Sequence, residues 1–564
     1  MFLPQKILDE IPHYKDNLTK FLAGEIKDDF FRGIRVPWGF YSQRGGQTLM
    51  SRLRIPGGIL TPQQLNCIGS TAKRLSKGKL HITTRQDIQI HSLPDENSIE
   101  IIESLKHVNI SPRGGGGNTV RNITGCYLSG ICPHENSEVY KIVWELTEYL
   151  LSLDETYTMP RKIKIAFSGC EYDCACTGVN DIGFVALKDG FKVLCGGGMG
   201  AKSAVGKILH KKVSLQEIGY SVKSLINLFN KYGNRKNRRH NRLRFLIQDF
   251  GWDKFVELYN QELNKAKETE HIILKTEDEL PQLPIINGSS QQQESMPSDG
   301  KAYEQFLKYC TGEQKQNGYR YIQLKVPLGE IDGDTLITLS QIVDDIPSII
   351  FRTTQRQNVI ISNVPANKLS YVYERLKCLL NESLSPETFL NIVCCKGVTT
   401  CNIGICNSVG LASQIENELH KITLDADKLK DLIININGCP NACGQHPVGM
   451  ISFSGIARKV NDRSVPFYRV FLGGKIDADN TIFAEQIGIV PARAIPALFT
   501  EFIVSFQENS DGTTFHYFSN QGKHHMKALI EKYSYVPPYE EDKSYYIDFG
   551  KTEDFSLEGL TKTC

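Results

Sequence analysis

Hydrophobic and polar residues alternate in matching segments of the two halves of this chain. Residues 80–91 and 351–362 alternate apolar with polar positions and are rich in β-branched residues, which predicts strands. Residues 62–75 and 333–346 have apolar residues at helical spacing, which predicts a helix before each strand. The same pair of elements is therefore predicted twice.

Further along each half, cysteines follow predicted apolar strands. The segments IKIAFSGC (163–170) and LIININGC (432–439) predict buried strands that end at a cysteine. The segment SEVYKIVWELTEYLLSL (137–153) predicts an amphipathic helix. This mixture of helices and strands predicts an α/β (α+β) fold.

The two halves also resemble each other in amino-acid sequence, so the chain is internally duplicated. LRIPGGILTPQQL (53–65) resembles LKVPLGEIDGDTL (324–336), and HITTRQDIQI (81–90) resembles RTTQRQNVII (352–361), both at an offset of 271 residues. Between the halves, residues 275–301 are rich in Gln, Ser, Pro and acidic residues, which predicts a linker or a long surface loop.

Composition describes an ordinary globular protein of several domains. The 564 residues are 40% apolar and 23% charged, with a net charge of +2. We expect no nucleic-acid or membrane partner, since the net charge is small and no apolar run could span a bilayer. The N-terminal segment is too polar and acidic for a signal peptide, so we expect a cytoplasmic protein. The basic stretch 235–244 is a local exception, for which a solvated helix face is the plain alternative.

Four cysteines recur as a set 269 residues later. In each half they are spaced C-x5-C and then, after a gap, C-x3-C: Cys126, Cys132, Cys170 and Cys174, then Cys395, Cys401, Cys439 and Cys443. Four thiolates in two short-spaced pairs suit a [4Fe–4S] cluster. A zinc site is disfavoured by the spacing. Cys176 and Cys394 are neighbours that could replace a ligand.

Six motifs in order carry a family resemblance. They are MSRLRIPGGILT (50–61), TTRQDIQIH (83–91), NTVRNITG (118–125), MPRKIKI (159–165), GNRKNRRHNRLRFLIQDFGWDKF (233–255) and NGCPNACGQ (437–445). With them, the chain resembles the siroheme-dependent nitrite and sulfite reductase family over nearly its whole length, its sulfite reductase branch most of all.

The resemblance implies a duplicated fold in which two ferredoxin-like halves pair and two larger α/β domains enclose one siroheme. We therefore expect these divisions: an N-terminal arm (1–45), a first ferredoxin-like half (46–110), a first siroheme and cluster domain (111–274), the linker (275–301), a second ferredoxin-like half (302–385), and a second siroheme and cluster domain with a C-terminal tail (386–564).

The resemblance also implies roles for individual residues. Cys395, Cys401, Cys439 and Cys443 would ligate the catalytic cluster, with Cys443 bridging to the siroheme iron. The substrate-binding cations would be Arg52, Arg121, Lys162 and Lys164. Siroheme contacts would come from Arg85, Gln89, Gln357, Asn358 and Asn441. The basic stretch 235–244 would lie near the siroheme carboxylates.

Four cations suit the reduction of a small anion, which also consumes protons. Lys162 and Lys164 are two apart on a predicted strand, so both face one side, and crowding lowers lysine pKa values toward those of proton donors. An exposed edge strand is the alternative for this pair. In the family, Lys-x-Lys is typical of sulfite reductases and Lys-x-Asn of nitrite reductases. We therefore expect six-electron reduction of sulfite, with nitrite as runner-up.

The first cysteine set departs from the family pattern, which keeps four cysteines only in the second half of many members. At the positions that would face this first cluster, Gln323, Leu390, Asp431 and Ile433 replace the four cations, and only Arg356 matches Arg85. We predict a second [4Fe–4S] cluster at Cys126, Cys132, Cys170 and Cys174, a relay or structural staple without catalysis. The alternative is a vestigial set that binds nothing.

Two further interpretations remain. A non-catalytic electron carrier with two clusters would not need the four cations. The glycine runs at residues 114–117 and 196–200 lack the arrangement of a nucleotide-binding loop. Electrons would therefore come from a partner, a ferredoxin or a separate flavoprotein subunit by resemblance.

Overall fold

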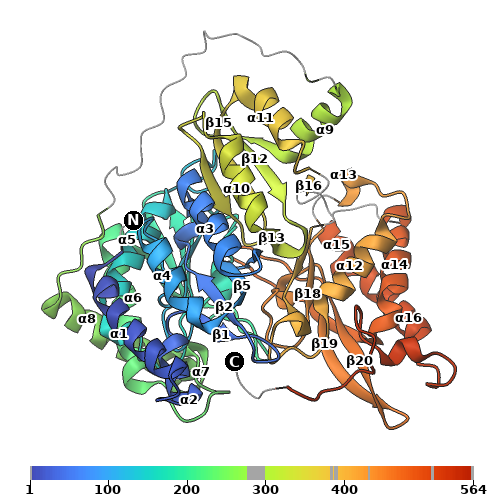
Figure 1. Ribbon diagram of the computed structural model, residues 1–564, viewed down its shortest axis with the longest axis horizontal. Coiled ribbons are helices and arrows are strands. Elements are labelled where there is room, and N and C mark those ends of the chain that lie inside the picture. The colour runs from blue at the N-terminus through green and yellow to red at the C-terminus, as the bar shows by residue number, and fades with distance from the viewer. Residues whose placement is uncertain are drawn as a thin grey trace.

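The computed structural model describes residues 3–275, 297, 299–380, 385–386, 391–429, 432–509 and 514–560. Two mixed α/β regions, one from each half of the chain, stand side by side, and the ferredoxin-like halves pack between and above them (Figure 1). Residues 276–296 and 298 of the expected linker, together with Leu390 and Asp431, lie outside the described residues.

The two ferredoxin-like halves share one order of elements, to which the second half adds a helix before it and a short strand after it. The first comprises β1 (Phe40–Ser42), β2 (Leu49–Leu53), β3 (Ile59–Leu60), α3 (Pro62–Leu75), β4 (Lys79–Ile82), β5 (Ile88–Leu93) and α4 (Ser98–Lys106). The second comprises α9 (Gly300–Cys310), β11 (Thr311–Glu313), β12 (Tyr319–Lys325), β13 (Glu330–Asp332), α10 (Gly333–Ile342), β14 (Ile350–Thr353), β15 (Val359–Pro365), α11 (Leu369–Leu376) and β16 (Ser385–Pro386). Ahead of them, α1 (Gln5–Leu22) and α2 (Asp28–Arg35) pack against each other.

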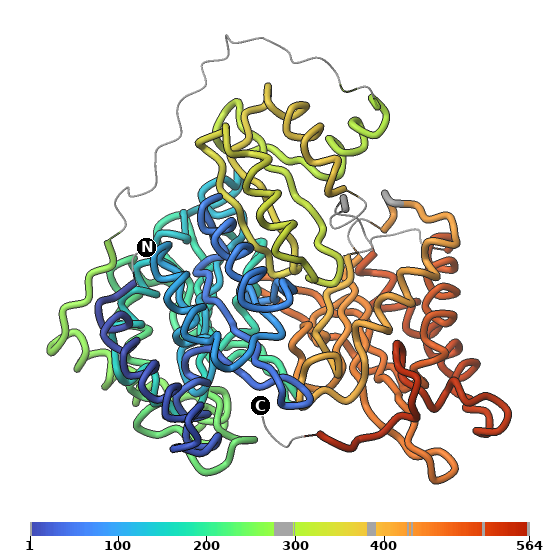
Figure 2. Tube along the Cα trace, in the orientation of Figure 1, coloured from blue at the N-terminus to red at the C-terminus, as the bar shows by residue number. Residues whose placement is uncertain are grey.

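Each half gives one edge strand to the other's sheet. The sheet orders are β1-β2-β5-β4-β13 and β11-β12-β15-β14-β3, so β13 closes the first sheet and β3 closes the second. Helices α3 and α10 cross at Gly69, where an added Cβ would lie 2.7 Å from the Gly333 carbonyl oxygen. The two halves consequently share a single apolar core, in which the blue and yellow segments of Figure 2 lie side by side.

The larger α/β regions also match in topology. The first contains β6 (Thr124–Gly125), α5 (Val139–Ser152), β7 (Ile165–Ser168), β8 (Ile182–Leu187), β9 (Gly190–Cys195), β10 (Lys207–Val213), α6 (Leu215–Tyr232), α7 (Leu243–Phe250) and α8 (Trp252–Thr269). The second contains β17 (Ile392–Cys394), α12 (Ser408–Leu419), α13 (Ala426–Leu429), β18 (Ile434–Asn437), β19 (Ile451–Val460), β20 (Arg463–Leu472), β21 (Glu485–Pro491), α14 (Ile495–Asn509), α15 (Thr514–Ser519) and α16 (Gln521–Tyr533).

Parallel pairing brings the cysteine pairs of each half together. β6 and β7 are parallel neighbours, as are β17 and β18. Cys126 directly follows β6, and Cys170 comes two residues after β7; Cys395 and Cys439 hold the same places after β17 and β18. Because carboxyl ends of parallel strands meet at one edge of a sheet, each C-x5-C pair lies beside its C-x3-C partner.

The structure confirms the mixed fold but corrects two element predictions. The segments 80–91 and 351–362 are each two strands joined by a tight loop, because Gln86 and Gln357 take left-handed φ values of 62° and 65°. The helix predicted over 333–346 ends at Ile342. None of the helices in the described part of the chain is long and apolar enough to cross a membrane.

Candidate active site

A five-residue loop joins the two central strands of each ferredoxin-like sheet and is built the same way twice. In loop 83–87, Thr83 Oγ1 accepts hydrogen bonds from the backbone N–H groups of Arg85 and Asp87, at 3.2 and 3.1 Å. Loop 354–358 contains the same two bonds at the same distances. The loops position Arg85 and Arg356 at equivalent places in the two halves.

The left-handed glutamine of each loop ties it to the cysteine strand of its own half. Gln86 Oε1 accepts from the Gly125 N–H at 3.0 Å, directly before Cys126. Gln357 Oε1 accepts from the Cys394 N–H at 2.8 Å, directly before Cys395. Both side chains are buried, so these bonds fix each cysteine strand against its loop.

Arg52 and Arg121 converge on one carbonyl of the first glycine run. Arg52 Nη1 donates to the Gly115 oxygen at 2.9 Å, and Arg121 Nη1 donates to the same oxygen. Arg121 Nη2 also donates to the Tyr41 hydroxyl at 3.1 Å, and the Arg52 guanidinium lies 5.5 Å from the centre of the Tyr41 ring. Two positive charges are thus held side by side.

Lys162 and Lys164 extend this positive cluster. Burial lowers the Lys162 pKa well below its usual range, and the charges of Arg121 and Lys164 lower it further. Burial lowers the Lys164 pKa to about 7, helped by Arg85 and Arg242 and opposed by Cys443 and Asp181. Both side chains keep partial exposure.

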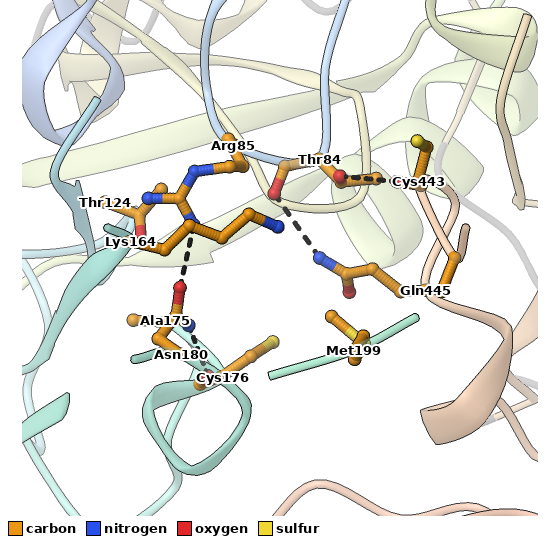
Figure 3. A pocket seen from close by; sticks show the side chains of 11 residues that line it. Thr84, Arg85, Thr124, Lys164, Ala175, Cys176, Asn180, Met199, Cys443 and Gln445 are labelled. Atoms are coloured by element: carbon orange, nitrogen blue, oxygen red, sulfur yellow. Dashed lines mark hydrogen bonds between the residues drawn. The ribbon is translucent and has the colours of Figure 1, made fainter. Parts of the chain in front are cut away.

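A small cavity lies between the two halves (Figure 3). It is lined by Thr84, Arg85, Thr124, Lys164, Ala175, Cys176, Asn180, Met199, Ala442, Cys443 and Gln445. Thr84 Oγ1 donates to the Cys443 carbonyl at 2.9 Å, and Gln445 Nε2 donates to the Thr84 carbonyl at 3.4 Å. The Lys164 ammonium points into the cavity, between Thr84 and Gln445. Cations of the first half therefore face the last cysteine of the second.

One cysteine of the second set, Cys443, lines this cavity. Cys439 is buried, Cys395 and Cys401 are half-buried, and Cys443 is exposed. The Gly438 N–H donates to Cys395 Sγ at 3.2 Å. In Figure 3 the Cys443 sulfur points away from the Lys164 ammonium. Among the described residues, no three His, Cys, Asp or Glu side chains converge closely enough to hold a single metal ion.

The comparisons with known proteins agree on one family. The model of the nitrite and sulphite reductase 4Fe-4S domain matches residues 116–267, and that of the nitrite/sulfite reductase ferredoxin-like half domain matches residues 41–108 and 312–378. The chain belongs to the nitrite and sulfite reductase family. It is therefore an oxidoreductase, and membership implies siroheme and a [4Fe–4S] cluster as its cofactors.

Individual members of the family resemble this one over most of their length. The assimilatory ferredoxin-dependent nitrite reductase of Haloferax mediterranei is 28% identical over 534 residues, covering 90% of this chain and 88% of that protein. Sulfite reductase [ferredoxin] 2 of Mycolicibacterium paratuberculosis is 25% identical over 470 residues, covering 78% and 79%. The solved structure of Mycobacterium tuberculosis NirA shares the fold, with a TM-score of 0.75 at 21% identity, covering 91% of this chain and 94% of that one.

The residues around the cavity of this family member fit an anionic macrocycle. Several buried guanidinium nitrogens have no hydrogen-bond partner among the described residues: Arg85 Nε, Arg121 Nε, Arg244 Nε and Arg244 Nη1. A Cβ added to Gly198 would lie 2.7 Å from Arg244 Nη1, so this glycine leaves room beside an unsatisfied cation. Peripheral carboxylates of siroheme are the partners that such nitrogens need.

Not every expected siroheme contact reaches the cavity. Arg85 lines it and donates to Asn180 Oδ1 at 2.8 Å. Gln89 pairs with Arg52 across two strands, accepting at 2.8 and 3.1 Å when its amide oxygen faces the guanidinium. Gln357 instead donates to backbone carbonyls of both halves, those of Ile82 and Cys394. Asn358 accepts from the Val326 N–H, and Asn441 is exposed.

Two residues of the site carry no motif and were missed in the sequence. Asp181 is fully buried; it accepts from the Lys164 backbone N–H at 2.8 Å and from Arg242 Nη2 at 2.6 Å. Tyr41 contacts both Arg52 and Arg121. The sequence gives one signal for Asp181: it comes directly before an apolar strand. Charged residues are rarely buried in such a position.

Proposed function

We propose that this protein reduces nitrite to ammonia by six electrons, taken from a ferredoxin. The observation that carries the proposal is the cation cluster of Arg52, Arg121, Lys162 and Lys164, which extends to the cavity that Cys443 lines. The relatives named as ferredoxin-dependent nitrite reductases support nitrite as the anion and ferredoxin as the donor.

The cations supply binding energy for a small anion. A unit charge pair at 4 Å contributes about 4 kcal/mol at an effective dielectric of about 20. Arg52 and Arg121 share a carbonyl acceptor, which fixes their two positive charges side by side and gives this region a field that attracts an anion. Asp181 holds the backbone of Lys164 in place, so the lysine can project into the cavity without rearrangement.

The lysines also hold protons where the reduction needs them. With a pKa of about 7, Lys164 can keep or release a proton at neutral pH, which suits a general acid. Its ammonium points into the cavity (Figure 3). A proton on Nζ would therefore lie beside an anion that binds there. When bound, siroheme supplies an iron for the nitrogen or sulfur atom of the anion and a ring that stores charge.

Sulfite reduction to sulfide is the second candidate, and Lys164 is the residue that favours it. Lys-x-Lys at positions 162–164 is the pattern that resembles sulfite reductases, and one relative is named as a ferredoxin sulfite reductase. A second ammonium suits an anion with a third oxygen and up to two negative charges. The relatives named for nitrite place this candidate second.

Steady-state kinetics separate the two candidates. The protein is purified anaerobically, its absorption spectrum is checked for siroheme bands, and kcat/KM is measured with nitrite and sulfite using reduced ferredoxin. We expect nitrite to give the higher kcat/KM. A sulfite value at least about tenfold higher would reverse the order of the two candidates, and a spectrum without siroheme bands would refute both.

The same assay tests the donor. Reduced ferredoxin should support turnover, whereas NADPH with a flavoprotein reductase but no ferredoxin should not. Turnover with the flavoprotein alone would refute ferredoxin as the electron donor. It would not affect the proposal that nitrite is the substrate.

A further inference from the structure

The four first-half cysteines lie together at the edge where β6 and β7 end. The Cys126 and Cys174 thiols are hydrogen-bonded to each other. Cys132 and Cys170 lie close enough to Cys174 for the thiol charges to interact. Cys126, Cys132 and Cys170 are buried and Cys174 is half-buried. Two strand ends and their loops therefore bring the four cysteines to one edge of the sheet, where each thiol interacts with at least one other of the set.

Hydrogen-bond donors converge on these sulfurs from the surrounding backbone. The N–H of Leu128 donates to Cys126, those of His134 and Glu135 donate to Cys132, and that of Tyr172 donates to Cys170. The Tyr127 hydroxyl bonds to Cys174. Donors of this kind stabilise thiolates. Hydrogen bonds to sulfur also help to set the reduction potential of an iron–sulfur cluster.

Cys195 shows that burial alone does not bring such donors. It lies at the end of β9 in the same region, is fully buried and belongs to the apolar core. No described residue donates a hydrogen bond to its thiol. Burial alone therefore does not explain the hydrogen-bond donors around the four-cysteine set.

The surroundings of this set are unsuited to an anionic substrate. Gln323 and Ile433 stand where the other site has Arg52 and Lys164. Asp173, beside Cys174, takes the place of Ala442, and its buried carboxylate accepts from the Thr177 N–H at 2.9 Å. A cofactor here would lie near the Asp173 carboxylate and the buried guanidinium of Arg352, in place of the four cations of the other site.

The set is nevertheless adjacent to the catalytic cavity. Ala175 and Cys176 directly follow Cys174, and both line the cavity that Cys443 and Lys164 also line (Figure 3). One short backbone segment therefore separates the first cysteine set from the place where the anion is reduced.

We propose that Cys126, Cys132, Cys170 and Cys174 bind a second [4Fe–4S] cluster, which relays electrons to the cavity. One electron enters from a one-electron donor protein of the ferredoxin class and one leaves toward the catalytic centre; no bond forms or breaks. The relay role rests on the proposed function, whereas the metal site stands without it.

Metal analysis of anaerobically purified full-length protein tests the site. We expect about eight irons and about eight acid-labile sulfides per chain beyond the siroheme iron, because two clusters of this type are present. About four irons with siroheme would overturn the second site and leave the proposed function standing. Zinc in place of the second four irons would also overturn it. About eight irons without siroheme would refute the proposed function and support the site.

Two alanine variants sharpen this count. Cys170→Ala should lose about four irons and keep the siroheme bands, whereas the control Cys195→Ala should keep every iron. Retention of all iron by Cys170→Ala would overturn the proposal. If that variant does not fold, spin counting on the wild type replaces it: stepwise reduction should give two cluster signals per chain, and a single signal would count against the site.

The relay is tested by changing the donor. Cys170→Ala should slow turnover with reduced ferredoxin by at least about tenfold and leave turnover with a small reduced dye, which can enter the cavity, within about twofold. An equal loss with both donors would mean that the cluster is structural, and an unchanged ferredoxin rate would remove the relay.

Discussion

The two halves of this protein build the same scaffold and put different chemistry on it. Loops 83–87 and 354–358 share their hydrogen bonds, and both cysteine sets follow parallel strands. Yet Cys443 is exposed and lines a cavity that Arg85 and Lys164 also line, whereas Cys174 is hydrogen-bonded to Cys126 and Tyr127. The difference teaches that a scaffold can keep its ligand positions while the facing side chains decide whether a site is catalytic.

The largest expected effect comes from removing the last cysteine of each set in turn. Cys443→Ala should abolish anion reduction with any donor, because Cys443 is the cysteine of the second set that lines the cavity. Cys174→Ala should keep reduction by a small dye. Rates measured for both variants beside the wild type check the contrast, and full activity of Cys443→Ala would reverse the assignment of the two sets.

Exchange of a cation should have the next largest effect. Lys164→Met should lower kcat/KM for nitrite about a hundredfold, since it removes a charge that points into the cavity. The reciprocal variant Ile433→Lys serves as a matched control in the other half and should leave kcat/KM unchanged. An equal loss of kcat/KM in Lys164→Met and Ile433→Lys would contradict the assignment of anion binding to the first half.

Asp181→Asn should destabilise the first half by about 3–5 kcal/mol, because it leaves Arg242 buried without its partner. It should also raise KM, because Lys164 loses its backbone anchor. Thermal unfolding and steady-state kinetics measure the two effects. A change in stability with an unaltered KM would confine Asp181 to a structural role.

The pH dependence of nitrite binding follows from the Lys164 pKa. A lysine with a lowered pKa of about 7 is positively charged below that pH and neutral above it, so KM should rise as pH increases through about 7. The slope should approach about tenfold per pH unit. Nitrite keeps a single negative charge over this range, so the titration belongs to the protein. Lys164→Met should show a flat profile, and the same slope in that variant would assign it to another group.

The smallest expected difference lies in the duplicated glutamines. Gln86→Ala and Gln357→Ala should each lower Tm by several degrees, because each leaves buried backbone groups unpaired. The two losses should be similar, since the loops share their geometry. A loss confined to one variant would mean that the halves differ in scaffold as well as chemistry.

Sequence patterns predicted the mixed fold, the duplication and the pairing of cysteines at strand ends. Each of these features can be recognised directly in the sequence, from the periodicity of apolar residues or from the spacing of repeated residues. The break at Gln86 was missed because its left-handed turn is stabilised by contacts with Gly57 and Thr353 from other parts of the chain. The pair of Asp181 and Arg242 was missed for the same reason.

The substrate also lay beyond the sequence patterns. Lys162 and Lys164 are visible as a pair, but their low pKa values depend on burial and on Arg85, Arg121 and Arg242. The sequence favoured sulfite through this pair, whereas most of the named relatives are ferredoxin-dependent nitrite reductases. The comparison of kcat/KM for nitrite and sulfite decides between the two anions.

The exchanged edge strands have a consequence for biosynthesis. His81 in β4 meets Glu330 in β13 across 249 residues of chain, so β4 leaves the ribosome long before its partner is made. Until then the nascent first half carries an unpaired sheet edge, which is a template for aggregation. Neither half can complete its sheet alone, so a gene split between residues 275 and 299 would yield protein only when both fragments are produced in the same cell.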